Sequence, residues 1–167
     1  RRTYDRDTRY HRELAYLYEE CQQPSRAREA LEELLAIDPH DVEARVEIAR
    51  LRLRELTYHF DLAITEPMLE VLRVALEDAP THRDAAFLTS LALELSAERS
   101  GQWSPAMSLR GQALLQSILN RDPDDNPARL LMAVHTFDRG QFEEASRAFA
   151  AALEAGPVDQ RQAFHSA

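Results

Sequence analysis

Apolar residues recur at helical spacing along most of the chain. Between residues 9 and 21 they are spaced three or four apart and form one stripe of a helix, made of Tyr10, Leu14, Leu17, Tyr18 and Cys21. After Pro24 and Ser25 a second stripe follows, made of Ala27, Leu31, Leu34 and Leu35. It ends at Asp38-Pro39, because a residue before proline disfavours the helical conformation. We therefore predict two consecutive helices here.

The same pairing of helical segments continues to the end of the chain. The pattern predicts further helices at 42–57, 65–78, 84–97, 105–120, 128–138 and 142–155. Every second helix ends at or before a proline, at positions 39, 80, 123 and 157. The chain has only 4 Gly and is rich in Ala, Leu, Glu and Arg, which are good helix formers. We predict an all-α protein.

The closing prolines are 41, 43 and 34 residues apart, and the last value is the period of the tetratricopeptide repeat. The last unit, counted from Asn126, resembles that family through Gly140, Phe142, Ala145, Phe149, Ala152 and Pro157. The first unit is similar to it through Leu14, Ala15, Tyr18, Ala27 and Pro39, with Leu31 in the place of an aromatic residue. The central units lack most signature residues.

This resemblance implies a single domain over residues 1–167, an α-solenoid of antiparallel helix pairs in a right-handed superhelix. The implied repeats are 8–41, 42–82, 83–125 and 126–159, and 160–167 would be a capping helix or the start of another repeat. Alanines 15, 27, 133, 145 and 152 would allow close helix packing, and Gly140 would supply a left-handed turn. Since the sequence begins with Arg1, we expect a fragment of a longer protein.

The central units are longer than 34 residues by 7 and 9, near positions 57–64 and 98–104. In the second unit we expect one extra turn on each helix, which keeps the apolar faces in phase. In the third unit Gly101 and the Ser104-Pro105 pair favour a loop followed by a new helix. Trp103 lies in that loop, where it is either a binding anchor or a cover over the adjoining helix ends.

The formal net charge of −9 argues against nucleic acid as a partner and disfavours anionic membrane surfaces. No segment approaches the ~20 apolar residues of a membrane span, so no membrane insertion is expected. All 20 basic residues are Arg, which fits a high-GC, bacterial coding bias. The single Cys21 leaves the compartment open between cytoplasm and periplasm.

The sequence contains no recognisable catalytic, cofactor or metal site. None of the six histidines forms a pair four residues apart, and no P-loop, dinucleotide or nucleophile-elbow motif occurs. Adjacent carboxylates such as Glu143-Glu144 diverge by about 100° on a helix and cannot converge on one bond. Cys21 ends an apolar stripe and is interpreted as a small hydrophobic residue. We predict no enzyme.

In the tetratricopeptide family the concave surface of the first helices usually binds an extended peptide or helix. The resemblance places in that groove Arg9, Arg12, Tyr16, Val46, Arg50, Leu53, Phe87, Leu91, Leu130 and Val134. Arg12 and Arg50 would clamp a carboxylate of the partner, or else pair with Glu13, Glu47 or other helix carboxylates. The chaperone-tail binding positions of the family carry Arg12, Tyr16, Glu47, Asp84 and Leu88 here, which does not support that function.

Three functions are compatible with the sequence. The leading one is a scaffold that binds a protein or peptide with an acidic and an apolar portion. The second is self-association, as a homo-oligomer, or intramolecular docking through the apolar residues Phe87, Leu91, Leu130 and Val134. The third is an accessory domain of an enzyme whose catalytic part lies outside this sequence.

Overall fold

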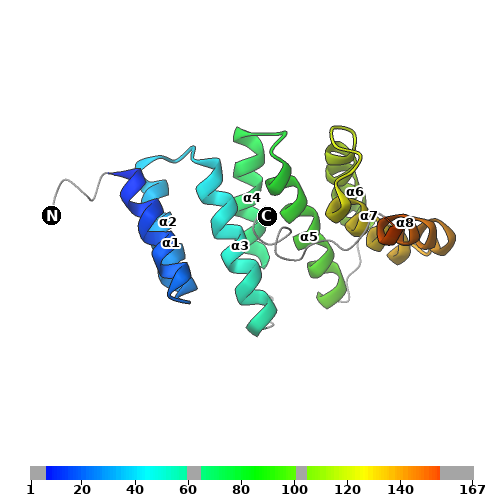
Figure 1. Ribbon diagram of the computed structural model, residues 1–167, viewed down its shortest axis with the longest axis horizontal. Helices are drawn as coiled ribbons and strands as arrows, with labels where there is room; N and C mark the ends of the chain where they lie inside the picture. Colours follow the sequence, from blue (N-terminus) through cyan, green and yellow to red (C-terminus); the bar gives the residue numbers. More distant parts are fainter. Residues whose placement is uncertain (1–6, 60–64, 101–104, 155–167) are drawn as a thin grey trace. The chain divides into compact units, whose positions relative to one another are not determined.

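The computed structural model describes residues 7–59, 65–100 and 105–154, and these residues form helices joined by turns (Figure 1). The all-α prediction is confirmed. The helices are α1 Thr8–Glu20, α2 Pro24–Ile37, α3 Val42–His59, α4 Thr65–Asp78, α5 Arg83–Ser100, α6 Pro105–Leu119, α7 Asn126–Asp138 and α8 Phe142–Glu154. Each lies where a helix is predicted, and most ends agree within two residues.

The central units gain their extra length mainly in their first helices. Helices α3 and α5 each have 18 residues, whereas α1 and α7 each have 13. Helix α4 has 14 residues, the same as α2, so the extra turn predicted for both helices of the second unit occurs only in α3. Residues 60–64 and 101–104, with Trp103, lie outside the described residues, so the predicted loop and the role of Trp103 stay predictions.

The chain divides into two compact units, Arg1–His82 and Arg83–Ala167. In the first unit α1 packs on α2, α2 on α3, and α3 on α4. In the second unit α5 packs on α6, α6 on α7, and α7 on α8, and α5 also contacts α7. Each unit therefore consists of two consecutive helix pairs, as the tetratricopeptide pattern implies.

Small residues allow the helices of each pair to approach closely. The core of the first unit is formed by Ala15, Ala27, Ala30, Leu31, Leu34, Ala44, Ile48 and Leu51. In the second unit Ala133 and Ala145 are fully buried and Ala152 is nearly so. The alanines predicted to lie between the helices are thus buried, and larger leucine and isoleucine side chains fill the space around them.

Helices α1 and α7 each end at a turn in which one residue has a left-handed backbone conformation. Gly140 follows α7 with φ of 76°, as predicted, and Gln22 occupies the corresponding place after α1 with φ of 58°. The amide of Gln141 donates to the carbonyl oxygen of Thr136 at 3.2 Å, and that of Gln23 donates to Tyr18 at 2.8 Å. Both turns are therefore Schellman motifs, and the sequence places glycine in only one of them.

Candidate protein-binding surfaces

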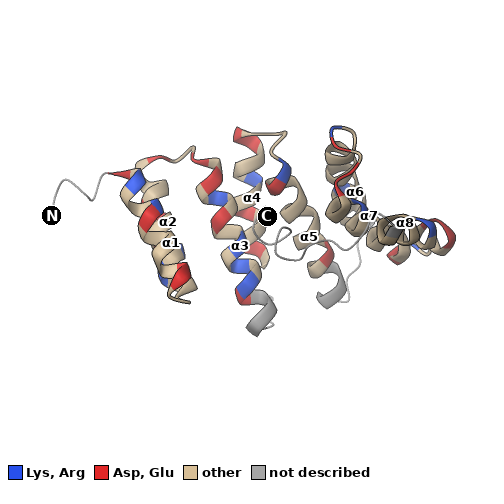
Figure 2. Cartoon of the chain, in the orientation of Figure 1, with Lys and Arg blue, Asp and Glu red and all other residues tan. Residues whose placement is uncertain are grey.

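The predicted groove residues of α1 lie on an exposed face of the first unit. The Tyr16 side chain is 63% exposed, and the side chains of Arg9 and Arg12 are 86% and 46% exposed. They follow one another at three- or four-residue spacing, so they share one face of α1. Figure 2 shows acidic residues beside basic ones on α1 and α3. This face can offer guanidinium groups and one aromatic ring to a ligand.

The arginines of this face already have carboxylate partners. Arg9 pairs with Glu13 over 3.2 Å, one turn away on the same helix. Arg12 of α1 forms an ion pair with Asp41, and Arg50 of α3 forms one with Glu47. Pairing within the protein, the alternative to a ligand clamp, therefore exists for both predicted clamp residues. A ligand carboxylate would have to compete with these partners.

Asp41 has a second role besides its contact with Arg12. Its carboxylate accepts a hydrogen bond of 2.9 Å from the amide of Ala44, which makes it the N-cap of α3. Asp125 caps α7 in the same way through the amide of Ala128, at 3.0 Å. The two caps stand in a repeated Asp-Pro-x-Asp-x-x-Ala pattern at 38–44 and 122–128, a signal that can be read in the sequence.

The remaining groove candidates of the first unit differ in exposure. Val46 is 2% exposed, so its side chain belongs to the interior of the unit and does not line its surface. Leu53 and Arg50 are half-buried. The candidates that reach solvent most fully are therefore Arg9, Arg12 and Tyr16, all on α1.

In the second unit, Phe87 and Leu91 on α5 and Leu130 and Val134 on α7 are all half-buried. Helices α5 and α7 contact each other, so both pairs of apolar residues lie on adjoining helices of one unit. The guanidinium carbon of Arg83 lies 4.9 Å from the centre of the Phe87 ring, a cation–π distance. This surface is apolar with a cation at its edge.

Arg83 also fixes the start of α5 to the cap of α7. Its Nε and an Nη donate to the two carboxylate oxygens of Asp125, at 2.8 and 2.9 Å. Burial alone would raise the pKa of Asp125, but its hydrogen bonds with Arg83 and the Ala128 amide outweigh this effect and lower that pKa. Burial acts to lower the pKa of Arg83, and its bonds with Asp125 and Asp84 raise that pKa overall. The pair is a bidentate structural contact between consecutive repeats.

A buried polar chain crosses the second unit, and no motif in the sequence indicates it. Ser90 Oγ lies 2.9 Å from Nε2 of His135, whose Nδ1 contacts the carboxylate of Glu94. The hydrogen bond from His135 lowers the pKa of Glu94 and outweighs the opposing effect of burial. The order serine, histidine, carboxylate is that of a hydrolase triad. However, Ser90 has no exposed surface and His135 is 1% exposed, so no substrate reaches the hydroxyl.

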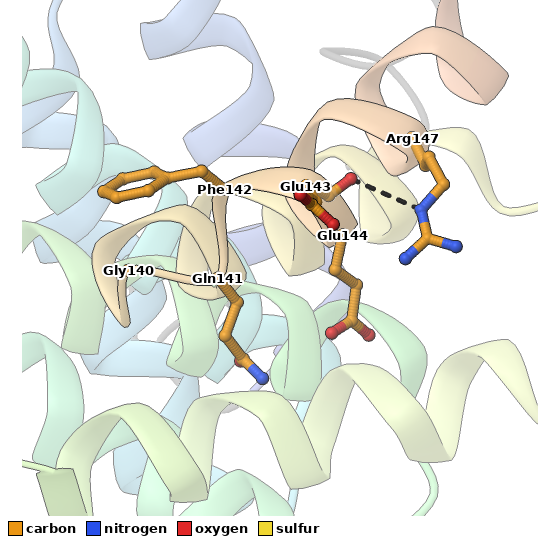
Figure 3. A pocket seen from close by; sticks show the side chains of 6 residues that line it. All are labelled: Gly140, Gln141, Phe142, Glu143, Glu144 and Arg147. Atoms are coloured by element: carbon orange, nitrogen blue, oxygen red, sulfur yellow. Dashed lines mark hydrogen bonds between the residues drawn. The ribbon is translucent and has the colours of Figure 1, made fainter.

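The rest of the described chain offers few groups for metal or ligand binding. Among the described residues no group of three or more His, Cys, Asp or Glu side chains could hold a metal ion. A shallow pocket at the start of α8 is lined by Gly140, Gln141, Phe142, Glu143, Glu144 and Arg147 (Figure 3). There Arg147 Nε donates to the backbone oxygen of Glu143 at 3.4 Å. No helix in the described part of the chain is both long and apolar enough to cross a membrane.

Models of the tetratricopeptide repeat match residues 8–51 and 110–165, which together make up more than half of the chain. These are the regions whose signature residues resemble the family, and the divergent central part falls largely between them. No curated protein sequence matches the chain.

Several solved structures share this fold. The crystal structure of MamA is 16% identical with a TM-score of 0.70, over 95% of this chain and 81% of that one. MamA from Desulfovibrio magneticus RS-1 is 16% identical with a TM-score of 0.69, over 90% of this chain and 76% of that one. TTC0263, a thermophilic TPR protein of Thermus thermophilus, is 17% identical with a TM-score of 0.69, over 89% of this chain and 74% of that one. At these identities the similarity concerns the fold.

Proposed function

Because the chain belongs to the tetratricopeptide repeat family, we propose that it is a non-catalytic scaffold that binds a peptide or helix of a protein partner on the first helices of its repeats. Folds of this family are typical of protein–protein interaction scaffolds. The observation that carries the proposal is the exposed face of α1, where Tyr16 is 63% exposed beside the exposed guanidinium groups of Arg9 and Arg12. Tyrosine and arginine are among the residue types most enriched in binding hot spots.

The first unit binds the acidic portion of the partner. The side chains of Arg9 and Glu13 are 86% and 68% exposed, and such an exposed ion pair contributes about 0–1 kcal/mol. A ligand carboxylate can therefore replace Glu13 as the partner of Arg9 at little cost. Tyr16 adds apolar contact area at a low entropic cost, because its side chain has only two rotatable bonds to order.

The second unit binds the apolar portion. Phe87, Leu91, Leu130 and Val134 are half-buried, so each keeps some apolar surface that a ligand could cover. The cation–π contact between Arg83 and Phe87 would orient the ring at the edge of this surface. We propose no catalytic step for either unit, because the one serine–histidine–carboxylate chain in the described residues is sealed from solvent.

The test is selection of displayed random 12-residue peptides on the immobilised chain. We expect enrichment of sequences with Asp or Glu beside an apolar residue, and binding that weakens as the salt concentration rises. The variant Arg9→Glu/Tyr16→Ala should lose these peptides while keeping its helical circular dichroism, since both side chains are well exposed. Leu109→Glu, at an exposed leucine on α6, is the matched control. Enrichment that is equal for parent and variant would refute the α1 face as the site.

A further inference from the structure

The exposed face of α1 that carries the proposed binding site continues past Tyr16 with two carboxylates. On an α-helix each residue turns the chain by about 100°, so residues spaced three or four apart share one side. A sector of about 100° around α1 thereby holds Arg9, Arg12, Tyr16, Glu19 and Glu20. This face is basic near the start of the helix, aromatic in the middle and acidic at the end.

Two ion pairs place this face beside α3 of the same unit. Near the start of α1, Arg12 pairs with Asp41, the N-cap of α3. Near the end of α1, an Nη of Arg54 in α3 donates to the carboxylate of Glu19 at 3.0 Å. The face therefore lies on the side of the unit where the first helices of two consecutive repeats are bridged.

Glu20 is the carboxylate of this face that is open to a ligand cation. It is exposed, and it forms no ion pair with the residues that the structure describes. Glu19, in contrast, is held by Arg54. At the basic end, Arg9 has only its exposed pair with Glu13, which a ligand carboxylate can replace. The face thus offers a cation and a carboxylate to a ligand at its two ends.

The charges of α1 run against the dipole of the helix. The amino end of a helix favours carboxylates, and the carboxyl end favours cations. Arg9 lies in the first turn of α1, which contains no acidic residue. Glu19 and Glu20 lie in the last turn, which contains no basic residue. This order of charges weakens the helix, so the stability of α1 gives no reason for it.

The spacing of these groups fits an extended peptide. Arg12 lies four residues before Tyr16 and Glu20 four residues after it, about 6 Å along the axis in each direction. In an extended chain alternate side chains point the same way and are about 6.6 Å apart. Side chains i, i+2 and i+4 of a ligand would therefore meet the basic, aromatic and acidic parts of the face. A helical ligand would instead need an apolar groove for its stripe, and this face offers a single ring.

We infer that the bound segment carries both charges, with an acidic, an apolar and a basic residue at positions i, i+2 and i+4. Its acidic end lies toward Arg9 and Arg12, and its basic end lies toward Glu20. The inference rests on the proposed function and specifies its ligand, since it adds a basic residue and fixes the direction of the segment along α1. The order can run either way along the ligand chain, because side chains alone make these contacts.

A nitroxide attached to Cys21 tests the direction of the bound segment. Cys21 is exposed, follows Glu20 and is the only cysteine of the chain, so the label lies at the acidic end of the face. The probe is a synthetic peptide with aspartate, leucine and arginine at alternate positions and serine between them. Paramagnetic broadening of its proton signals falls steeply with distance from the label. We expect the arginine signals to broaden most and the aspartate signals least.

Reversal of the charges should reverse this result. The variant Arg9→Glu/Glu20→Arg has the net charge of the parent, and each new charge lies at the helix end that favours it, so the fold should be retained. With this variant the aspartate signals should broaden most. Glu20→Gln alone should weaken peptide binding by up to about fivefold, the contribution of one exposed ion pair. Leu109→Glu, at an exposed leucine of α6, is the control and should behave like the parent.

A second peptide with serine in place of aspartate measures the simple attraction of arginine to Glu19 and Glu20. It should broaden less than the full peptide at equal concentration, because it lacks the contact with Arg9 and Arg12. Broadening as strong as that of the full peptide would overturn the inference.

The remaining outcomes separate this inference from the proposed function. Equal broadening at both ends of the full peptide would show that it binds without a fixed direction, which overturns the inference and leaves the proposed function standing. The same holds if selected peptides bind to α1 and the probe does not broaden. If neither the selected peptides nor the probe bind to α1, both proposals fall.

Discussion

The hydroxyl oxygen of Ser90 lies 2.9 Å from Nε2 of His135, and any side chain at position 111 would force one of these two residues to shift. A Cβ at Gly111 would lie 2.9 Å from two ring atoms of His135 and 3.1 Å from the Ser90 hydroxyl. Helix α6 thus approaches the pair closely because one of its residues lacks a side chain. The glycine serves packing here, since it lies within a helix and needs no left-handed backbone.

Gly111→Ala should destabilise the protein, although alanine is the better helix former. Helix propensity alone would add about 1 kcal/mol of stability. The added methyl group would instead press on the His135 ring, and overpacking in a core costs about 1–3 kcal/mol. Urea unfolding of parent and variant measures the difference. In a His135→Ala background, where the ring is absent, the same change should be neutral or favourable; an equal loss in both backgrounds would contradict the contact.

Stability should fall in acid partly because of Glu94. Its folded-state pKa is lowered, mainly by the hydrogen bond with His135, so it contributes stability above its unfolded pKa of about 4.3. That contribution is lost as the pH falls through the lower, folded-state pKa. Unfolding free energies measured from pH 7 down to pH 3 should show a weaker pH dependence in Glu94→Gln. If the unfolding free energy of the parent and of this variant changed equally with pH, Glu94 would not make this contribution.

Asp125 should matter both as a helix cap and as an ion-pair partner. Asp125→Ala should cost about 1–3 kcal/mol, because it removes the cap and leaves Arg83 without its carboxylate. Asp125→Ser keeps a capping oxygen and should recover part of this loss. Thermal unfolding of both variants, each with and without Arg83→Ala, separates the two contributions. Losses that are the same for alanine and serine would exclude the capping role.

Putting glycine at position 22 and glutamine at position 140 should have opposite effects on stability, because both positions have a left-handed backbone. Gln22→Gly should stabilise the chain by up to about 1 kcal/mol, because glycine adopts positive φ without steric cost. Gly140→Gln should destabilise it by a similar amount, since open space around position 140 leaves backbone strain as the only cost. Urea unfolding of both variants gives the comparison. Changes of the same sign would contradict the shared turn geometry.

Much of the fold could be predicted because helical spacing and turn signals are local. The apolar stripes of α1 and α2, the prolines that end the second helices and Gly140 are all readable from short stretches of sequence. Helix α5 is longer than its apolar pattern predicts, because no proline or glycine stops it before Ser100. The missing turn in α4 depends on tertiary packing, which helical period alone does not specify.

The site was less predictable because its contacts join distant residues. The repeat pattern predicts that Arg12 binds a ligand. In the structure its partner is instead Asp41, a helix cap 29 residues away in the sequence. His135 and Ser90 are 45 residues apart, and neither stands in a motif. The repeat position of Val46 predicts a surface residue, yet its side chain is buried in the first unit. Such pairings depend on how the helices rotate against each other, which a single sequence does not encode locally.

The nearest-neighbour packing of the helices also bears on how the protein folds. Within each unit a helix packs mainly on the helices before and after it in the chain, so most contacts close short loops. Short loops lose little entropy on closure, and chains of low contact order fold in microseconds to milliseconds. Folding can begin in any helix pair and spread to the next. A ligand on α1 would then stabilise the first helix pair directly, and would stabilise the second pair of the same unit only through the contact of α2 with α3.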